Sequence, residues 1–164
     1  MATHPAQAVH VLQVANADLC SGLTDLISEA CAEGFDWIGR LPTDWSRRRL
    51  VGVGEGLFVA VGDGQLFGMA AITADPALDD DRTGRLRYVY VRVPARGRGI
   101  AALLLKTCLR RACDKWSMLR LHTDNPAAAR LYERHGFSPL KGDPRNTHML
   151  DMREGRAPRI GNGG

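Results

Sequence analysis

The sequence is poor in the features that mark membrane, secreted and repeat proteins. Its 164 residues contain no apolar run of about 18 residues, the length that a helix needs to cross a bilayer, so we expect no membrane partner. The N-terminal stretch, residues 1–14, has neither a positively charged start nor a long apolar core. We therefore expect no secretory leader.

Cysteine is scarce, and its spacing is not that of a metal site. The chain has 4 cysteines, Cys20, Cys31, Cys108 and Cys113, and none of them forms a C-x-x-C pair. Small buried side chains explain such isolated cysteines better than zinc ligands or disulfides do. We expect no bound metal, and the cytoplasm is the default compartment for a chain without a disulfide framework.

Aromatic residues are also few, and none of them interleaves with the short arginine clusters of the chain. Phe, Tyr and Trp make up 6% of the chain, which carries a formal net charge of +4. The arginines are spread along the chain, with short clusters at 47–49, 96–98 and 153–159. Because a nucleic-acid surface usually combines a broad basic face with aromatic stacking, we expect no nucleic-acid partner. A compact polyanionic ligand explains one localised cluster better.

What the sequence does contain is typical of a soluble globular protein. Hydrophobic residues make up 45% and charged residues 24% of the chain, and a chain of this length can bury a substantial core. We expect a single domain over residues 1–152, with residues 153–164 as a flexible tail.

Hydrophobic periodicity and turn residues predict the secondary structure. The strongest helical pattern has Ile100, Leu104, Cys108 and Ala112 on one face. The predicted elements are strand 9–15, helix 18–34, loop 35–45, helix 42–51, hairpin strands 57–61 and 65–73, strand 85–93, helix 100–116, strand 118–123, helix 125–135 and strands 137–140 and 146–152. This order predicts an α+β fold with α/β-type layers, in which a mixed, mostly antiparallel central sheet of about six or seven strands has helices on both faces.

The junction between strand 85–93 and helix 100–116 combines positive charge with a flexible backbone. Its central residues are Arg96, Gly97, Arg98 and Gly99. The first N–H groups of a helix have no internal partner, and the helix dipole adds partial positive charge there. Glycine lets a ligand approach the backbone closely, and the arginines add charge. We infer an anion-binding site, most naturally for a phosphate or pyrophosphate.

Two common phosphate loops do not fit this junction. The P-loop pattern G-x-x-x-x-G-K-[ST] is absent from the chain. The dinucleotide pattern G-x-G-x-x-G/A is formally met from Gly97 to Ala102, but the strand before it is not the first of the chain. Residues 116–120, where the acidic ribose partner would follow, contain no acidic residue. We therefore discount NAD.

Two sequence blocks carry a family resemblance. Residues 96–101 fit the pattern R/Q-x-x-G-x-G/A, and residues 125–137 fit N-x-x-A-x-x-L-Y-x-x-x-G-F. In this order, the two blocks resemble the acyl-CoA loop and the following helix of the GNAT family of N-acetyltransferases, with close resemblance over residues 85–140. The resemblance implies a GNAT-like acyl-CoA N-acyltransferase fold, with acetyl-CoA as the co-substrate.

The resemblance also implies which residues hold the cofactor. The backbone N–H groups of the loop would bind the CoA pyrophosphate, and the strand before the loop would splay from its neighbour and pair with the pantetheine arm. Asn125 would help to hold that arm, although it is also suited to cap the helix that follows. The implied cofactor-binding residues are Val91, Arg92, Val93, Arg96, Gly97, Arg98, Gly99, Ile100, Ala101 and Asn125.

Tyr132 is the implied catalytic residue. In the family, the tyrosine at this place protonates the departing CoA thiolate or donates a hydrogen bond to it. Tyrosine has a pKa of about 10 and a thiol a pKa of about 8.5, so the phenol can stabilise the developing charge before any full proton transfer. The alternative is that Tyr132 is a core aromatic residue of its helix.

The resemblance does not assign a general base. Many family members carry a glutamate on the central strand, whereas strand residues 85–90 here include arginines at the corresponding places. Other titratable side chains are available, and the sequence does not choose among them. These alternatives are Glu33, Asp36, His122, Asp124 and His148.

In the family, the first two helices and the last strand pair select the acceptor. The corresponding segments here are residues 34–45 and 141–147. Three aromatic residues either line a pocket or close the core beneath the helices, namely Phe35, Trp37 and Trp45. Two carboxylates would attract a cationic amine, namely Asp36 and Asp44.

Together these features predict an N-acetyltransferase. It would move the acetyl group of acetyl-CoA to a primary amine by direct attack in a ternary complex, with neither a metal nor a covalent enzyme intermediate. The acceptor would be a small-molecule amine, or a protein lysine or N-terminus, and the protein a monomer or homodimer. The alternative is a non-catalytic acyl-CoA-binding sensor or regulatory module. Tyr132 favours the enzyme, and the missing strand glutamate favours the sensor.

Overall fold

The computed structural model describes residues 8–16, 22–48, 50–75, 77–78 and 80–154. The chain divides into two compact units. Unit 1 comprises Met1–Thr73 and Leu86–Asp114, and unit 2 comprises Ala74–Arg85 and Lys115–Gly164. The predicted helix start at residue 18, Cys20 and the tail beyond residue 154 lie outside the described residues.

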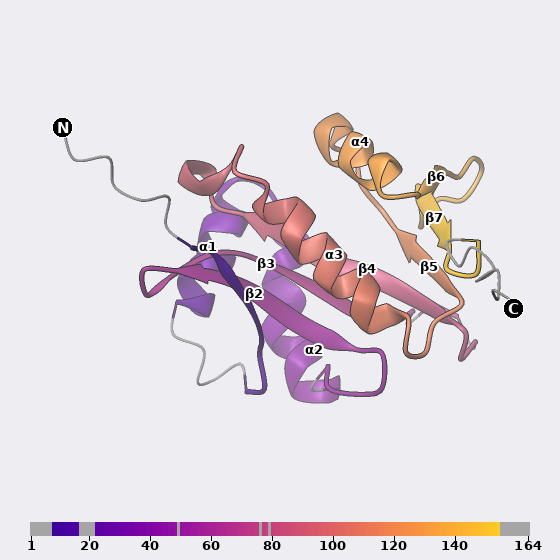
Figure 1. Ribbon diagram of the computed structural model, residues 1–164, viewed down its shortest axis with the longest axis horizontal. Helices are drawn as coiled ribbons and strands as arrows, with labels where there is room; N and C mark the ends of the chain where they lie inside the picture. Colours follow the sequence, from indigo (N-terminus) through magenta and orange to yellow (C-terminus); the bar gives the residue numbers. More distant parts are fainter. Residues whose placement is uncertain (1–7, 17–21, 49, 76, 79, 155–164) are drawn as a thin grey trace, which may run out of the picture. The chain divides into compact units, whose positions relative to one another are not determined.

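Seven strands form a mixed sheet in the order β1-β2-β3-β4-β5-β7-β6 (Figure 1). The strands are β1 His10–Gln13, β2 Gly56–Gly62, β3 Gln65–Ala74, β4 Thr83–Val91, β5 Met118–Leu121, β6 Ser138–Pro139 and β7 His148–Asp151. The β4–β5 pair is parallel, whereas β1–β2, β2–β3, β5–β7 and β6–β7 are antiparallel. The predicted mixed, mostly antiparallel sheet is therefore confirmed.

Four α-helices and two short 3₁₀ segments complete the fold. They are α1 Leu23–Ala32, η2 Asp36–Arg40, α2 Leu41–Arg48, η3 Val93–Ala95, α3 Ile100–Ala112 and α4 Pro126–Arg134. In unit 1, α3 lies in front of the sheet in Figure 1, and α1 and α2 lie behind it. No helix within the described ranges is long and apolar enough to span a lipid bilayer.

The alternation of side chains along the strands of unit 1 explains these two layers. Leu57 and Val59 of β2 share a buried cluster with Leu26 of α1 and Leu41 of α2. The other face of the sheet meets α3, because a Cβ at Gly68 of β3 would lie 3.3 Å from the Leu104 side chain. The prediction of helices on both faces is confirmed.

Several predicted boundaries differ from the structure, and two of these differences concern the elements on either side of the loop. β4 ends at Val91 rather than at residue 93, and η3 follows it. Pro94 within η3 has no N–H to donate to a strand ladder. α3 ends at Ala112 rather than at residue 116. Trp116 instead belongs to unit 2, where its ring packs over Gly84 and would lie 2.8 Å from a Cβ there.

The segment predicted as a loop over residues 35–45 is helical for most of its length. η2 covers Asp36–Arg40, and α2 begins at Leu41. Ile38 and Leu41 are buried in the unit 1 cluster, with exposed fractions of 0% and 1%. Burial of these two side chains outweighs the weak local propensity of the segment.

The described cysteines are all free, and they differ in burial. Cys108 is buried, Cys31 is half-buried and Cys113 is exposed. Burial raises the pKa of the Cys108 thiol, so this side chain is a small apolar core residue, as predicted. The same prediction is wrong for Cys113.

We expect Gly68→Ala to destabilise the protein. A Cβ there would lie 2.7 Å from the Tyr90 carbonyl oxygen, and a backbone atom cannot move aside by changing a rotamer. Overpacking of this kind costs about 1–3 kcal/mol, so the midpoint of thermal unfolding by circular dichroism should fall. The control is Gly52→Ala, whose Cβ would meet the flexible end of Glu55 at 3.0 Å. Equal midpoints for both variants would contradict the close approach of β3 and β4.

Candidate active site

The predicted anion site is the turn between η3 and α3, within unit 1. Gly97 and Gly99 have φ values of +77° and +75°, a left-handed conformation that other residues rarely adopt. The Leu103 N–H donates to the Gly99 carbonyl at 3.0 Å. The N–H groups of residues 100–102 therefore precede the helical ladder and point toward the N-terminal end of α3.

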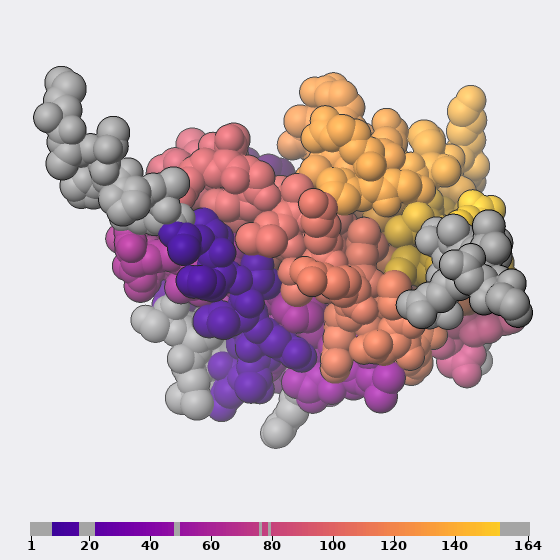
Figure 2. All heavy atoms as spheres, viewed as in Figure 1, coloured from indigo at the N-terminus to yellow at the C-terminus, as the bar shows by residue number. Residues whose placement is uncertain are grey.

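This turn is open to solvent. Residues 96–99 are exposed, and an ideal Cβ at Gly97 or Gly99 would find no described atom within 4 Å. Figure 2 shows this pink segment on the surface of the molecule. Gly99 begins α3 without a side-chain cap. The backbone donors and the positive end of the helix dipole are therefore accessible to an anion.

The Arg96 side chain turns away from the glycines. Its Nη2 donates to both carboxylate oxygens of Glu33, at 2.9 and 2.8 Å, and its Nε donates to the Val91 carbonyl at 2.9 Å. The guanidinium also lies 5.6 Å from the centre of the Tyr90 ring. The charge of Arg96 is thus already paired with a carboxylate, although we expected this charge to attract the anion.

Arg98 is the other predicted cation of the turn. The residue is exposed, and its guanidinium lies 5.1 Å from the centre of the Phe67 ring. Stacking of this kind holds the cation near the surface at a small energetic gain. Arg98 is therefore the guanidinium of the turn that faces solvent.

The predicted pantetheine strand has its own contacts at the end of β4. Val91 is the last strand residue and is buried, and Val93 is 57% exposed within η3. The Arg92 N–H donates to the Phe67 carbonyl at 2.8 Å, and Arg92 Nε donates to Glu29 at 2.9 Å. The pairing of β4 with β5 runs over Thr83–Arg85 and Met118–Arg120, which leaves residues 86–91 beyond the paired stretch.

Glu33 and Tyr90 meet beside the turn. The Tyr90 hydroxyl donates a short hydrogen bond to Glu33 Oε1. This bond and the Arg96 guanidinium keep the pKa of Glu33 below its usual value, and burial together with the carboxylate raises the pKa of Tyr90 to about 12. Glu33 is therefore ionised at neutral pH and already accepts several hydrogen bonds, so it is poorly suited to act as a base.

A second carboxylate binds the irregular part of β4. Tyr88 has a φ of +55°, a strained conformation for a non-glycine residue. Its hydroxyl and Arg87 Nη2 (2.6 Å) both donate to Asp44 Oδ2. Burial and the neighbouring carboxylate raise the pKa of Tyr88. Asp44, which was expected to attract an amine, is thus engaged by an arginine of the sheet.

The aromatic residues of the acceptor segment divide between the two predicted roles. Trp45 is buried in the unit 1 core, with 7% exposed. Trp37 is 55% exposed, and its ring stands edge-on to Phe35 with centres 5.3 Å apart. Phe35 in turn contacts Tyr90, with ring centres 5.9 Å apart. Trp45 therefore closes the core, and Trp37 with the exposed Asp36 faces solvent.

Unit 2 contains the second motif. Asn125 is the N-cap of α4, since its Oδ1 accepts from the N–H groups of Ala127 (2.9 Å) and Ala128 (3.4 Å). Tyr132 on α4 is 6% exposed and packs edge-on against Phe137, with ring centres 5.9 Å apart. The capping role of Asn125 and the packing role of Tyr132 are thus both present.

The remaining candidate bases of unit 2 have acidic partners. His122 Nε2 lies 3.3 Å from Asp124 Oδ2 near the end of β5, and both side chains are exposed. His148 of β7 is buried, with its Nε2 3.1 Å from Glu133 Oε1. Both pairs lie within unit 2, and neither identifies a general base.

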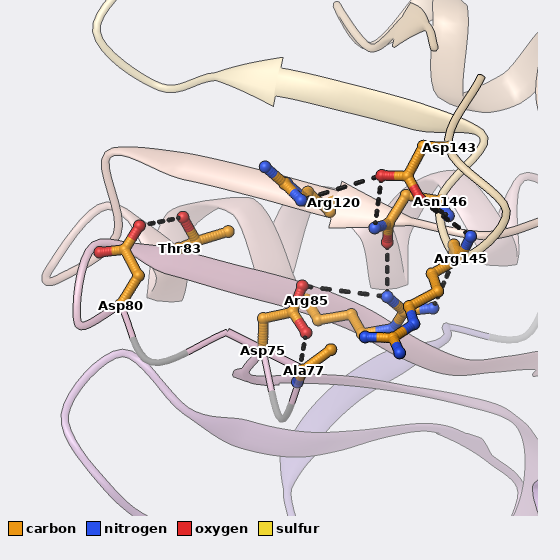
Figure 3. A network of polar contacts seen from close by, with 9 residues as sticks. All are labelled: Asp75, Ala77, Asp80, Thr83, Arg85, Arg120, Asp143, Arg145 and Asn146. Carbon is orange, nitrogen blue, oxygen red and sulfur yellow. Dashed lines mark hydrogen bonds and ion pairs between the residues drawn. The ribbon is translucent and has the colours of Figure 1, made fainter. Parts of the chain in front are cut away.

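Arginines occupy the sheet where a glutamate was expected, and one of them is held by a polar network in unit 2 (Figure 3). Arg85 donates to Asn146 Oδ1 and to the Arg145 carbonyl, and its Nη1 lies 3.9 Å from the buried Asp75. Asn146 in turn donates to Asp143 at 3.1 Å. Part of the predicted acceptor segment, residues 141–147, is therefore used to bind this arginine.

The sequence did not predict the long-range ion pairs that Arg92 and Arg96 form. Arg96 and Glu33 are 63 residues apart, as are Arg92 and Glu29. One signal was available, because the two glutamates and the two arginines have the same spacing of four residues, the glutamates at the end of α1 and the arginines on either side of η3. Within the described residues, no group of three or more His, Cys, Asp or Glu residues could hold a metal ion.

Comparison with known proteins identifies the family. The profile of the Acetyltransferase (GNAT) family matches residues 24–137, which is more than half of the chain and includes both motifs. The chain belongs to the GNAT acetyltransferase family. It is an acetyltransferase, and the sensor alternative is set aside. A comparison with curated protein sequences finds no match.

Solved structures of similar fold agree with this family. A proposed acetyltransferase from Exiguobacterium sp. 255-15 is 26% identical, with a TM-score of 0.80 over 92% of this chain and 99% of that chain. A GNAT acetyltransferase from Staphylococcus aureus Mu50 is 16% identical, with a TM-score of 0.68 over 88% and 99%. A proposed phosphinothricin N-acetyltransferase is 15% identical, with a TM-score of 0.63 over 88% and 99%. The last two support the fold alone.

The Glu29–Arg92 ion pair should make stability depend on acidity. The hydrogen bond from Arg92 lowers the pKa of Glu29, so the pair stabilises the fold above the unfolded pKa of about 4.3 and loses this effect as the pH falls through the folded value. Thermal unfolding of wild type should therefore lose midpoint temperature from pH 6 to pH 3 more steeply than Glu29→Gln. Parallel curves for the two proteins would contradict the pairing.

Proposed function

We propose that this acetyltransferase holds acetyl-CoA by its diphosphate at residues 96–101 and transfers the acetyl group to a primary amine. The observation that carries this proposal is the start of α3, where Gly97 and Gly99 lie open to solvent and the first N–H groups have no helical partner. A diphosphate is the ligand whose oxygens use several such donors at once.

The positive charge of the turn that is available to the diphosphate does not include that of Arg96. Arg96 is neutralised by Glu33, so the attraction comes from the backbone amides, the helix dipole and Arg98. The N–H groups of Gly97, Gly99, Ile100 and Ala101 are the proposed donors. This division leaves Arg96 to fix the shape of the turn rather than to contact phosphate.

We propose two further groups of residues that bind the pantetheine arm of acetyl-CoA. The backbone of Val91 and Val93, on either side of Arg92, is proposed to pair with the pantetheine arm in the manner of an added strand. Asn125 is proposed to donate its side-chain NH₂ to that arm, because its Oδ1 already caps α4. We further infer that both units belong to one catalytic domain, since the family match runs through both.

The proposed reaction is direct acyl transfer in a ternary complex. The acceptor nitrogen forms a bond to the acetyl carbon, the carbon–sulfur bond breaks, and the sulfur leaves as a thiolate. Tyr132 is the proposed acid that donates a hydrogen bond and then a proton to this sulfur. The nitrogen loses its proton to solvent or to a base. Glu33 and Asp44 are unsuited to act as this base, because both are bound to arginines.

The proposed acceptor contacts come from the start of η2. Trp37 presents an exposed ring and Asp36 an exposed carboxylate. A cationic amine is attracted both by a carboxylate and by the face of an indole ring. We therefore propose amines as acceptors, either small molecules or the lysines and N-termini of proteins.

The test of this function is thiol release from acetyl-CoA with a panel of amines. The panel should contain polyamines, amino acids, a lysine peptide and phosphinothricin, since one structural relative carries that acceptor in its name. We expect turnover with at least one amine and none without protein. Tight CoA binding with no turnover on any amine or peptide would contradict the proposal.

Tyr132→Phe should separate chemistry from binding. The phenylalanine keeps the ring that packs against Phe137 and removes only the hydroxyl, so CoA affinity and the unfolding midpoint should stay near wild type. Loss of a general acid lowers kcat by about 100-fold or more. The measurement is steady-state kinetics with the best amine of the panel, and a kcat equal to that of wild type would remove Tyr132 from the chemistry.

A further inference from the structure

Glu29 of α1 and Glu33, the C-cap residue of that helix, bind two arginines that follow β4. Glu29 accepts from Arg92, with Nε at 2.9 Å from Oε2 and a short contact from Nη2 to Oε1. Glu33, the C-cap residue four positions later, accepts from Arg96 at 2.9 and 2.8 Å. Arg92 precedes η3 and Arg96 follows it, so the two pairs fasten α1 to both sides of this short segment.

The two ion pairs differ in the additional hydrogen bonds that their side chains form. Arg92 also donates to the Leu66 carbonyl of β3 at 3.2 Å, which ties that pair to the sheet. The Glu33 carboxylate accepts in addition from the Tyr90 hydroxyl, and Arg96 Nε reaches the Val91 carbonyl. The Glu33 pair thus connects α1, the last residues of β4 and the first residue of the glycine turn.

The Glu33–Arg96 ion pair lies directly beside the glycine turn. Arg96 is directly followed by Gly97, and both glycines of the turn have left-handed φ values. Glycine loses the most conformational freedom on ordering, and a Cβ at either position would touch no described atom. Apart from the stacking of Arg98 on Phe67, the contacts that shape this turn therefore lie at its ends, which are α3 on one side and Arg96 on the other.

We propose that Glu33 is a positioning residue for the acyl-CoA loop. By holding Arg96 and Tyr90 together, it orders the turn so that the amides of residues 97–101 converge on the diphosphate before the ligand arrives. The inference rests on the proposed binding of acetyl-CoA and adds the residue that prepares the site. Glu33 touches neither the acetyl group nor the diphosphate in this account.

The test compares CoA binding by wild type and Glu33→Gln using titration calorimetry on the full chain. Glutamine keeps the size of the side chain but removes its charge and one acceptor oxygen. We expect the dissociation constant for CoA to rise about tenfold, the scale of one charge-assisted hydrogen bond. Acetyl-pantetheine, which lacks the diphosphate, should bind both proteins equally.

Glu29→Gln is the matched control, since it removes the same kind of ion pair with an arginine four residues earlier, within α1. We expect it to change the CoA dissociation constant by less than about twofold. An equal loss in Glu29→Gln and Glu33→Gln would overturn the proposal, because the effect would then be general loosening of α1. So would an equal loss of CoA and acetyl-pantetheine in Glu33→Gln.

The outcomes also separate this inference from the proposed function. If wild type itself takes up no CoA, the proposed function fails first. If wild type binds CoA and Glu33→Gln binds it equally well, the positioning role alone is overturned. If Glu33→Gln does not fold, Tyr90→Phe removes one donor and retains the ion pair. It should weaken CoA binding by about threefold, and unchanged binding in that variant would also overturn the role.

Discussion

The site depends on one structural constraint, which is that a helix begins immediately after a strand and a turn with two left-handed glycines. That geometry leaves the first N–H groups of α3 without partners. An anion with several oxygens satisfies them, and no side chain of the described turn competes for them. The close approach of β3 and β4 at Gly68 and the burial of Ile100 and Leu104 hold the strand and the helix that flank this turn.

The distribution of charge around β4 follows a consistent rule. Three carboxylates near the first helices, Glu29, Glu33 and Asp44, are each bound by an arginine of β4 or of the segment after it. Glu33 and Asp44 also accept hydrogen bonds from tyrosines of β4. Of the two arginines of the turn, Arg96 is therefore neutralised within the fold, whereas Arg98 faces solvent. The proposed anion affinity then depends on Arg98 and on backbone dipoles, which are fixed in place and keep their charge at any pH.

The parts of the fold that the sequence predicts are those with local signals. The Asn125-Pro126 start of α4, the glycines before α3 and the order of strands and helices all depend on neighbouring residues, and all are present in the structure. The end of β4 was placed too late because Val93 suits a strand, whereas Pro94 ends the ladder. The helical character of residues 36–40 depends on burial of Ile38, which no local pattern reveals.

The parts that were not predicted depend on residues far apart in the chain. The partners of Arg96 and Arg87 lie 63 and 43 residues away. The residues next to an arginine in the sequence do not indicate which distant carboxylate it will contact in the fold. The same limit applies to the tryptophans, because only the packing of α2 distinguishes the buried Trp45 from the exposed Trp37. The motifs therefore predicted a cofactor-binding turn at residues 96–101, and the structure shows which carboxylates pair with the arginines around it.

The most direct test of the account is a nuclear magnetic resonance titration of ¹⁵N-labelled protein with CoA. If the backbone grips the diphosphate, the amide resonances of Gly97, Gly99, Ile100 and Ala101 should show the largest shifts on adding CoA. Acetyl-pantetheine should leave the same resonances in place. Saturable CoA binding that leaves these amides unmoved would contradict the central claim.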